Sequence, residues 1–127
     1  MEENLALNHV NLEVVDVKAN AEFFARHFGF RTLGESMGGR VVIMTDTAGM
    51  AFAISNLEGV DHVEYPKWFH IGFYQPDDAT VDAIHDRLSS EGVEVGERKE
   101  FHGAWTFYTR APGGYLVEVF HQRNQRR

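Results

Sequence analysis

The sequence contains an internal repeat, and this feature limits the possible folds more than any other. Residues 8–16, NHVNLEVVD, align with residues 69–77, FHIGFYQPD, at an offset of 61, so that His9 falls on His70. Residues 45–55 align with residues 110–120 at an offset of 65, which places Ala53 on Glu118. Self-similarity of this kind indicates that one supersecondary unit occurs twice in the chain.

Each half predicts the same order of elements: a strand, a helix and three further strands. Apolar residues recur at three- and four-residue spacing after the first strand of each half, which predicts the helices. The expected elements of the first half are 6–15, 17–28, 30–36, 40–46 and 50–55, and those of the second are 67–74, 78–91, 93–99, 104–110 and 115–121. Asp16 and either Asp77 or Asp78 are expected to cap the helices, because a short acceptor side chain can bond the free first-turn amides.

This pattern predicts an α+β fold in one domain, residues 1–127, built from two tandem βαβββ modules. Module one covers about residues 6–56 and module two about residues 67–122. On the last strand, Val117 and Val119 share one face, whereas Glu118 and Phe120 share the other, because side chains alternate along a strand. The apolar faces fit beneath the helices. We expect the mixed faces of the two sheets to line the interior of an incomplete barrel.

Two imidazoles and a carboxylate, those of His9, His70 and Glu118, fall on the mixed faces. The chain has no cysteine, so a transition-metal site must use imidazole and carboxylate ligands. Such a set suits one ion of Fe, Mn, Zn, Ni or Co and leaves positions open for substrate. The alternative is that the histidines are ordinary hydrogen-bonded strand residues and that Glu118 is a surface carboxylate.

Charge and hydropathy exclude several kinds of partner. The chain has a formal net charge of −7 and no basic patch, which argues against nucleic acid. No apolar run approaches the roughly 20 residues that span a bilayer. The first residues lack the features of a signal peptide, so a cytoplasmic location is expected. Aromatic residues make up 13% of the chain, and Trp68, Tyr74, Trp105 and Phe120 are either pocket walls or core residues.

Several segments resemble the vicinal oxygen chelate superfamily, which includes glyoxalase I, extradiol dioxygenases and bleomycin-resistance proteins. They are NHVNLEVVD with AEFFARHFGF, the strand FHIGF, and the terminal FYTRAPGGYLVEVF, and the resemblance spans residues 6–122. It implies paired modules, a small-molecule substrate and a divalent metal held by His9, His70 and Glu118. It also implies a homodimer, in which modules pair either within one chain or between two chains.

The resemblance suggests further site residues. Tyr108 stands where several members place a tyrosine that contacts substrate, although it could equally be a core aromatic residue. His62 and His102 are the loop histidines available for acid–base chemistry, and the alternative for both is a solvated surface histidine. We select His102 with Tyr108 as the catalytic candidates. The candidate substrate-binding residues share the mixed faces: Asn11, Trp68, Tyr74 and Phe120. A departure is Ala53, because glyoxalase I supplies a second glutamate from that strand.

The sequence therefore favours a divalent-metal-dependent enzyme whose small organic substrate binds through vicinal oxygens. A dioxygenase-like or glyoxalase-related reaction is the best expectation. The alternative is a metal-free protein that sequesters a small molecule or drug, similar to the bleomycin-resistance proteins. The negative charge and the aromatic residues suit that alternative, but a metal-free binder has no need for a trio of metal ligands.

Overall fold

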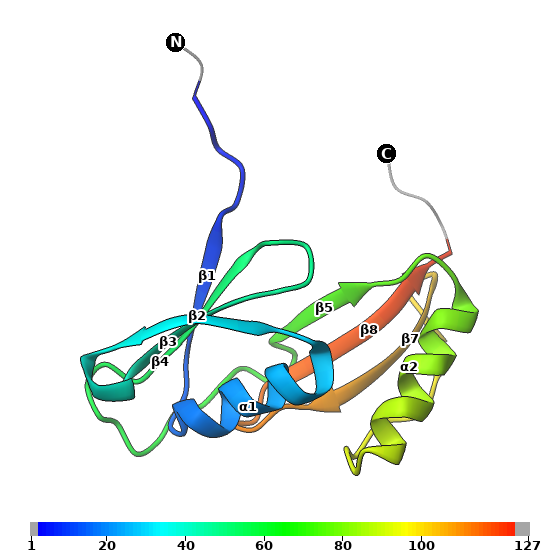
Figure 1. Cartoon of the computed structure of the whole chain (residues 1–127). Coiled ribbons are helices and arrows are strands. Elements are labelled where there is room, and N and C mark those ends of the chain that lie inside the picture. Colours follow the sequence, from blue (N-terminus) through cyan, green and yellow to red (C-terminus); the bar gives the residue numbers. More distant parts are fainter. Residues whose placement is uncertain (1–2, 124–127) are drawn as a thin grey trace. The chain divides into compact units, whose positions relative to one another are not determined.

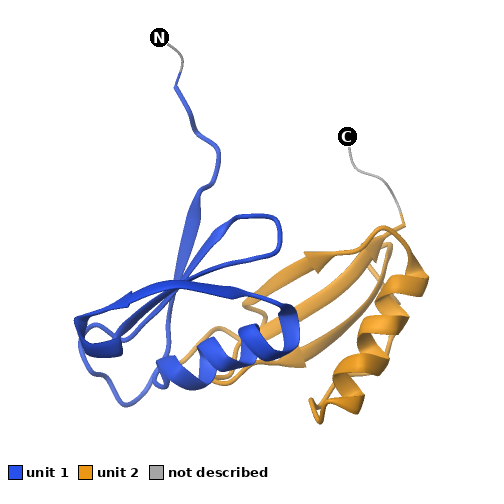
Figure 2. Cartoon of the chain, in the orientation of Figure 1, with its two compact units in different colours: residues 1–63 blue, residues 64–127 orange. Residues whose placement is uncertain are grey.

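The computed structural model describes residues 3–123 and divides into two compact units, residues 1–63 and 64–127 (Figure 2). Each unit contains one helix and one four-stranded mixed sheet. The α+β fold and its two tandem βαβββ modules are thus confirmed, and each sheet is open rather than closed into a barrel.

The first unit has the strand order β1-β4-β3-β2 (Figure 1). Its elements are β1 (His9–Glu13), α1 (Val17–Phe28), β2 (Arg31–Ser36), the 3-10 helix η1 (Met37–Gly39), β3 (Val41–Thr45) and β4 (Ala51–Ser55). Strand β1 runs parallel to β4, whereas the other neighbours are antiparallel. Helix α1 packs against β2, β3 and β4, so one face of the sheet is covered by the helix.

The second unit repeats this topology with the order β5-β8-β7-β6. Its elements are β5 (His70–Tyr74), α2 (Asp78–Ser90), β6 (Lys99–Phe101), β7 (Ala104–Arg110) and β8 (Leu116–Gln122). Strand β5 is parallel to β8, and helix α2 packs against β7 and β8. The two central strands are therefore β7 and β8, which also carry most of the side chains of the candidate site.

Aspartate caps both helices, as the sequence predicts. The Asp16 side chain accepts a hydrogen bond from the Ala19 amide at 2.9 Å, and Asp77, not Asp78, accepts one from the Thr80 amide at 2.8 Å. The hydrogen bonds from the hydroxyl and the amide of Thr80 lower the pKa of Asp77. Helix α1 ends at Gly29, whose φ of 71° is a conformation that glycine adopts without a Cβ clash.

Strand alternation sorts the side chains as expected. In the second unit Val117 and Val119 are fully buried with Phe107, and α2 contributes Val81 and Leu88 to the same core. In the first unit Phe24 of α1 packs on Phe30 and Phe52 with ring centroids 5.0 Å apart in each pair. On the opposite face, the second sheet carries polar and aromatic residues, whereas the first carries polar and small or aliphatic ones.

The predicted strand at 93–99 is wrong. Only Lys99–Phe101 forms a strand, and residue Val95 makes an isolated bridge to Thr109. The Gly96 amide donates to the Tyr108 carbonyl at 2.8 Å, and a Cβ at Gly96 would lie 3.0 Å from that oxygen. The chain therefore approaches β7 closely at Gly96 before it pairs regularly, and the apolar alternation of Val93 and Val95 alone does not reveal this.

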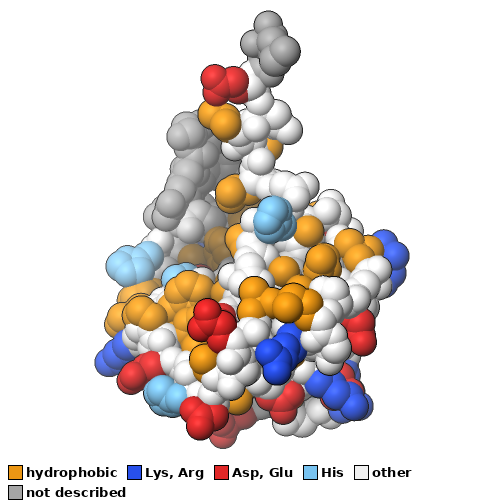
Figure 3. All heavy atoms as spheres, turned by 90° about the vertical axis from the view of Figure 1, so that its left-hand side faces the viewer, with side chains coloured by type: hydrophobic (Ala, Val, Ile, Leu, Met, Phe, Trp, Pro, Cys, Tyr) orange, Lys and Arg blue, Asp and Glu red, His pale blue; other side chains and the backbone are white. Residues whose placement is uncertain are grey.

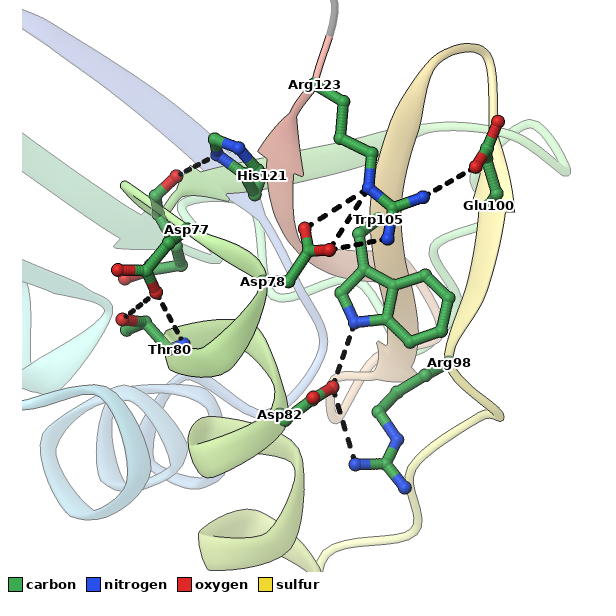
Figure 4. A network of polar contacts seen from close by, with 10 residues as sticks. Asp77, Asp78, Thr80, Asp82, Arg98, Glu100, Trp105, His121 and Arg123 are labelled. Atoms are coloured by element: carbon green, nitrogen blue, oxygen red, sulfur yellow. Dashed lines mark hydrogen bonds and ion pairs between the residues drawn. The ribbon is translucent and has the colours of Figure 1, made fainter.

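Trp105 is also not a pocket wall. It lies on the helix-facing side of β7, and its indole N–H donates to Asp82 of α2 at 2.8 Å (Figure 4). The Arg123 guanidinium lies 5.0 Å from its ring centroid and pairs with Asp78 and Glu100. Alternation explains the correction, because an odd-numbered residue of β7 points away from the mixed face.

The surface combines charged and apolar side chains. Figure 3 shows hydrophobic side chains gathered on one face of the molecule, among charged groups. Large apolar side chains exposed in the first unit include Leu33, Met37 and Ile43. Among residues 3–123, no helix is long and apolar enough to cross a membrane.

Candidate functional site in the second unit

A pocket of about 930 Å³ lies on the mixed face of the second sheet. Its walls come from β5, β6, β7 and β8, from the β6–β7 turn and from the residues that precede β5. The lining residues are Trp68, His70, Tyr74, Phe101, His102, Ala104, Tyr108, Glu118, Phe120 and Gln122. All seven site residues that the sequence selected in the second module therefore line one cavity: Trp68, His70, Tyr74, His102, Tyr108, Glu118 and Phe120.

Strand register brings the polar residues together. Glu118 lies on β8 between Gly72 of β5 and Tyr108 of β7, which are its partners in the two ladders. A Cβ at Gly72 would lie 3.2 Å from the Phe120 ring and 3.8 Å from a Glu118 oxygen. Because Gly72 has no side chain, Phe120 and Glu118 have room to occupy the space above β5.

The backbone fixes the orientation of the His70 ring. Its Nδ1 atom lies 2.8 Å from the Trp68 carbonyl oxygen, and a carbonyl can only accept, so Nδ1 carries the proton of that bond. In the neutral imidazole the electron pair is then on Nε2. That atom lies 3.6 Å from Oε1 of Glu118. In that neutral form, two electron-pair donors face each other across the pocket floor.

A hydrogen bond within the sheet holds the second carboxylate oxygen of Glu118, Oε2. The Thr106 hydroxyl donates to Oε2 of Glu118 at 2.7 Å, and only 13% of the Glu118 side chain is exposed. Thr106 itself is fully buried. The carboxylate therefore has one oxygen bound within the sheet and one turned toward His70.

Tyr108 is a neutral phenol in this environment. Burial raises its pKa to about 12, and the charge of Glu118 and a hydrogen bond to that carboxylate act in the same direction. The His70 and Tyr108 rings meet edge to face, with centroids 5.9 Å apart. At neutral pH the Tyr108 hydroxyl can consequently donate a hydrogen bond or a proton, and it is not a ready base.

Aromatic rings form the outer walls. Tyr74 and Phe120 meet edge to face with centroids 5.7 Å apart, and Trp68 is 60% exposed at the rim. Such exposed rings offer a planar ligand a large apolar contact area. His102 stands in the β6–β7 turn with a φ of 52°, beside the Phe101 ring. A positive φ is costly for a residue other than glycine, so the turn places His102 at the rim at the expense of some backbone strain.

The sequence reasoning did not select Thr106, Lys99 or Phe101 for this site. Lys99 and Thr106 are partners in the β6–β7 ladder, so they share the mixed face. The Lys99 ammonium lies 5.3 Å from the Phe101 ring centroid and 5.8 Å from that of Tyr108. The available signal was strand parity, because Thr106 and Tyr108 are two residues apart on one strand.

The equivalent positions of the first unit are apolar. The offset of 65 places Val41, Ile43 and Ala53 where the second unit has Thr106, Tyr108 and Glu118. The ladder confirms the local equivalence, since Ile43 pairs with Ala53 as Tyr108 pairs with Glu118. No carboxylate therefore occupies this position in the first unit.

Two candidates of the first unit make local hydrogen bonds. Asn11 accepts a hydrogen bond from the Ser55 hydroxyl at 2.9 Å, and Nδ1 of His9 lies 3.0 Å from the Asn8 side-chain oxygen. The Nε2 atom of His9 is again the ring position that carries the electron pair in the neutral form. The participation of His9 in a ligand set with His70 and Glu118 stays a prediction. Within residues 3–123, no group of three or more His, Asp or Glu side chains is placed to hold a metal ion.

The remaining histidines have structural positions. His27 is buried against the sheet side of α1, and His85 packs edge to face on Phe107 with centroids 5.0 Å apart. His121 points away from Glu118, as its parity predicts, and its Nδ1 atom lies 2.9 Å from the Gln75 carbonyl oxygen. His62 is exposed in the segment between the two sheets.

Comparison with known proteins gives the family. The model of the Glyoxalase/Bleomycin resistance protein/Dioxygenase superfamily matches residues 6–119, and the chain belongs to this superfamily. A possible glyoxalase from Bacillus cereus is 38% identical, with a TM-score of 0.77 over 91% of this chain and 98% of the other. No relative is found among the curated proteins.

Two more distant structures share the fold. Lactoylglutathione lyase from Agrobacterium tumefaciens is 20% identical, with a TM-score of 0.77 over 96% of this chain and 97% of the other. TnmS3, an antibiotic binding protein from Streptomyces sp. CB03234, is 17% identical, with a TM-score of 0.74 over 96% of this chain and 99% of the other. Proteins with this fold therefore include both an enzyme and a binding protein, so the function of this chain has to be argued from its site.

Proposed function

We propose that the protein is a divalent-metal-dependent enzyme that acts on a small organic substrate bound through vicinal oxygens. A dioxygenase-like or glyoxalase-related reaction fits the family best. The observation that carries the proposal is the placement of His70 Nε2 opposite Glu118 Oε1, at 3.6 Å, on the floor of an aromatic-walled pocket.

The chemistry of this pair fits a metal ion. In the neutral form of His70, with its proton on Nδ1, both facing atoms offer electron pairs, as two ligands of one ion must. Two ligands bonded at 2.0–2.2 Å to one ion lie at most about 4.2 Å apart, and 3.6 Å is within this limit. We propose that His9 completes the set with His70 and Glu118, and that the ion is Fe, Mn, Zn, Ni or Co.

Such an ion, when bound, supplies a Lewis acid or an oxygen-activating centre. The side chains of the pocket would bind the substrate and transfer protons. The Tyr108 phenol, which bonds the Glu118 carboxylate in the free protein, would donate its hydrogen bond to a substrate oxygen when substrate binds, and His102 at the rim would exchange a proton with solvent. The rings of Trp68, Tyr74 and Phe120 hold the apolar part of the substrate and exclude water, and Asn11 contributes a polar contact from the first module.

Metal titration of chelator-treated protein tests this proposal. We expect one ion per chain from at least one of Mn²⁺, Fe²⁺, Co²⁺, Ni²⁺ and Zn²⁺, and we expect His70→Ala to weaken binding at least tenfold. His121→Ala is the matched control, because His121 also bonds a backbone carbonyl but lies on the other face of β8. A folded wild-type protein that takes up none of the five ions would refute the proposal.

A second candidate is a metal-free protein that sequesters a cationic aromatic drug. The half-buried Glu118 carboxylate among exposed Trp68 and Tyr74 rings favours it, since aromatic faces and a carboxylate both attract cations. Its relative in fold, TnmS3, is described as an antibiotic binding protein. A thermal-shift measurement in EDTA with bleomycin and with ethidium separates the candidates. Stabilisation by either probe in EDTA, without uptake of metal, would support the binding protein.

We also propose that residues 6–56 and 67–122 act as paired modules of one domain and that two chains form a homodimer in the cytoplasm. The exposed apolar residues Leu33, Met37 and Ile43 support an association of this kind, because such side chains gain from burial. Sedimentation velocity at several protein concentrations measures the oligomeric state. A monomer at all concentrations would contradict the dimer and leave the site proposal intact.

A further inference from the structure

We infer that Thr106 is a positioning residue that orients the Glu118 carboxylate toward His70. The inference rests on the proposed metal site. Thr106 lies in the middle of β7, is fully buried, and donates its hydroxyl proton to Oε2 of Glu118 at 2.7 Å. The other oxygen, Oε1, is then the one that faces His70.

The contact is more than a way to satisfy a buried hydroxyl. The same Thr106 hydroxyl lies 3.2 Å from the Val119 carbonyl, which could accept its proton without any help from Glu118. The shorter distance is to the carboxylate, and hydrogen bonds to an ionised acceptor are shorter and about twice as strong as neutral ones. The single hydroxyl proton is thus directed mainly to the Glu118 carboxylate.

The internal repeat supplies a comparison within the chain. At the position equivalent to Thr106 the first unit has Val41, a side chain of nearly the same shape without the hydroxyl. At the position equivalent to Glu118 it has Ala53. The hydroxyl and the carboxylate are therefore present together in one module and absent together in the other, as a functional pair requires.

The physical effect is a loss of freedom in the Glu118 side chain. A glutamate has three rotatable side-chain bonds, and ordering them costs conformational entropy. The hydrogen bond from Thr106 to Oε2 already restricts rotation of the carboxylate in the ligand-free protein, so less entropy is lost when a ligand binds. Outer partners that orient a ligand in this way typically contribute 10–100-fold in metal affinity.

The test uses three variants of the full chain. Thr106→Val removes the hydroxyl and keeps the shape, and Thr106→Ser keeps the hydroxyl. Thr109→Val is the matched control, because Thr109 is a second buried threonine of β7 whose hydroxyl donates to the Glu94 carbonyl at 2.6 Å on the other face. All three are titrated with Mn²⁺ and Zn²⁺ by calorimetry, and their thermal stability is recorded.

We expect Thr106→Val to weaken metal binding about 10–100-fold and Thr106→Ser to stay within about threefold of wild type. Thr109→Val should lose thermal stability without any change in metal affinity. Unchanged affinity in Thr106→Val, or an equal loss in Thr109→Val, overturns the inference.

A second measurement separates this inference from the proposed function. ¹³C relaxation of the Glu118 Cγ methylene, recorded in metal-free protein, reports the order of the side chain. We expect greater mobility in Thr106→Val, and wild-type order in Thr106→Ser and Thr109→Val. If wild type binds no ion and this pattern appears, the metal proposal fails and the positioning role stands. If wild type binds an ion and Glu118 order is the same in all variants, the positioning role fails.

Discussion

The substitution Glu118→Ala tests whether metal binding at the site can be lost while the fold is kept. The variant removes the carboxylate that faces His70 and accepts from Thr106. If the pair holds an ion, its affinity should fall by more than about 100-fold, which exceeds the 10–100-fold effect of outer partners. The fold should survive, because Val117 and Val119, on the other face of β8, make the core contacts of that strand.

The stability loss can be estimated from the contacts. Hydrogen bonds to a charged group contribute about 1.5–3 kcal/mol, and removing a half-buried carboxylate returns part of this as relief of desolvation. The Thr106 hydroxyl keeps the Val119 carbonyl as an acceptor and is not orphaned. We therefore expect a loss of about 1–2 kcal/mol, which corresponds to roughly 4–8 °C in the melting temperature of a chain of this size.

Calorimetric titration with Mn²⁺ and Zn²⁺, together with thermal unfolding, measures both quantities. The matched control is Glu100→Ala, since Glu100 is a carboxylate of the same sheet that faces the helix side and pairs with Arg123. The control should bind metal as wild type does. The reasoning is refuted if Glu118→Ala binds metal within threefold of wild type, or if it does not fold.

Further variants probe the surroundings of the site. Tyr108→Phe should remove a phenol that titrates near pH 12 in ultraviolet difference spectra. Folding raises the pKa of Tyr108 from 10.0 to about 12, so wild type should lose stability as the pH rises from 10 to 12, and the variant should lose less. Arg123→Gln should change urea unfolding only slightly, and less still at high salt, because its ion pairs are exposed and screened by solvent. A stability loss as large as that of Glu118→Ala would instead assign these pairs a buried role. Ala53→Glu should destabilise the first unit by about 1–3 kcal/mol. If a threonine at position 41 supports this carboxylate as Thr106 supports Glu118, adding Val41→Thr should recover about 0.5–1.5 kcal/mol. A double-mutant cycle without any coupling between the two substitutions would contradict this expectation.

Periodicity in the sequence is enough to locate most elements of this fold. Helix α1 and strand β7 have the predicted bounds, 17–28 and 104–110. Both segments have clear signals: an aspartate cap with a glycine stop for α1, and alternation over seven residues for β7. The segment 93–99 has only the short alternation of Val93 and Val95. Its contact with the sheet depends on the close approach of Gly96 to the Tyr108 carbonyl, which involves no side chain.

The candidate site was predictable where it depends on strand parity. Parity places His70, Tyr108 and Glu118 on one face, and all three line the pocket. The same rule excludes Trp105, which was considered as a wall on composition alone. The role of Thr106 could not be read in this way, because it depends on the register between β7 and β8 and on which carboxylate oxygen the hydroxyl meets.

The repeat explains how one chain can combine a stable scaffold with a demanding site. Both modules bury apolar side chains between the helix and one face of the sheet, and the shared topology depends on this core. A half-buried carboxylate costs stability unless it is bonded, so it is tolerated only where a donor is built beside it. The second module has that donor in Thr106, whereas the first has Val41 beside Ala53 and avoids the cost. The modules therefore differ in the chemistry of the face opposite the helix, and that face is where function must be sought.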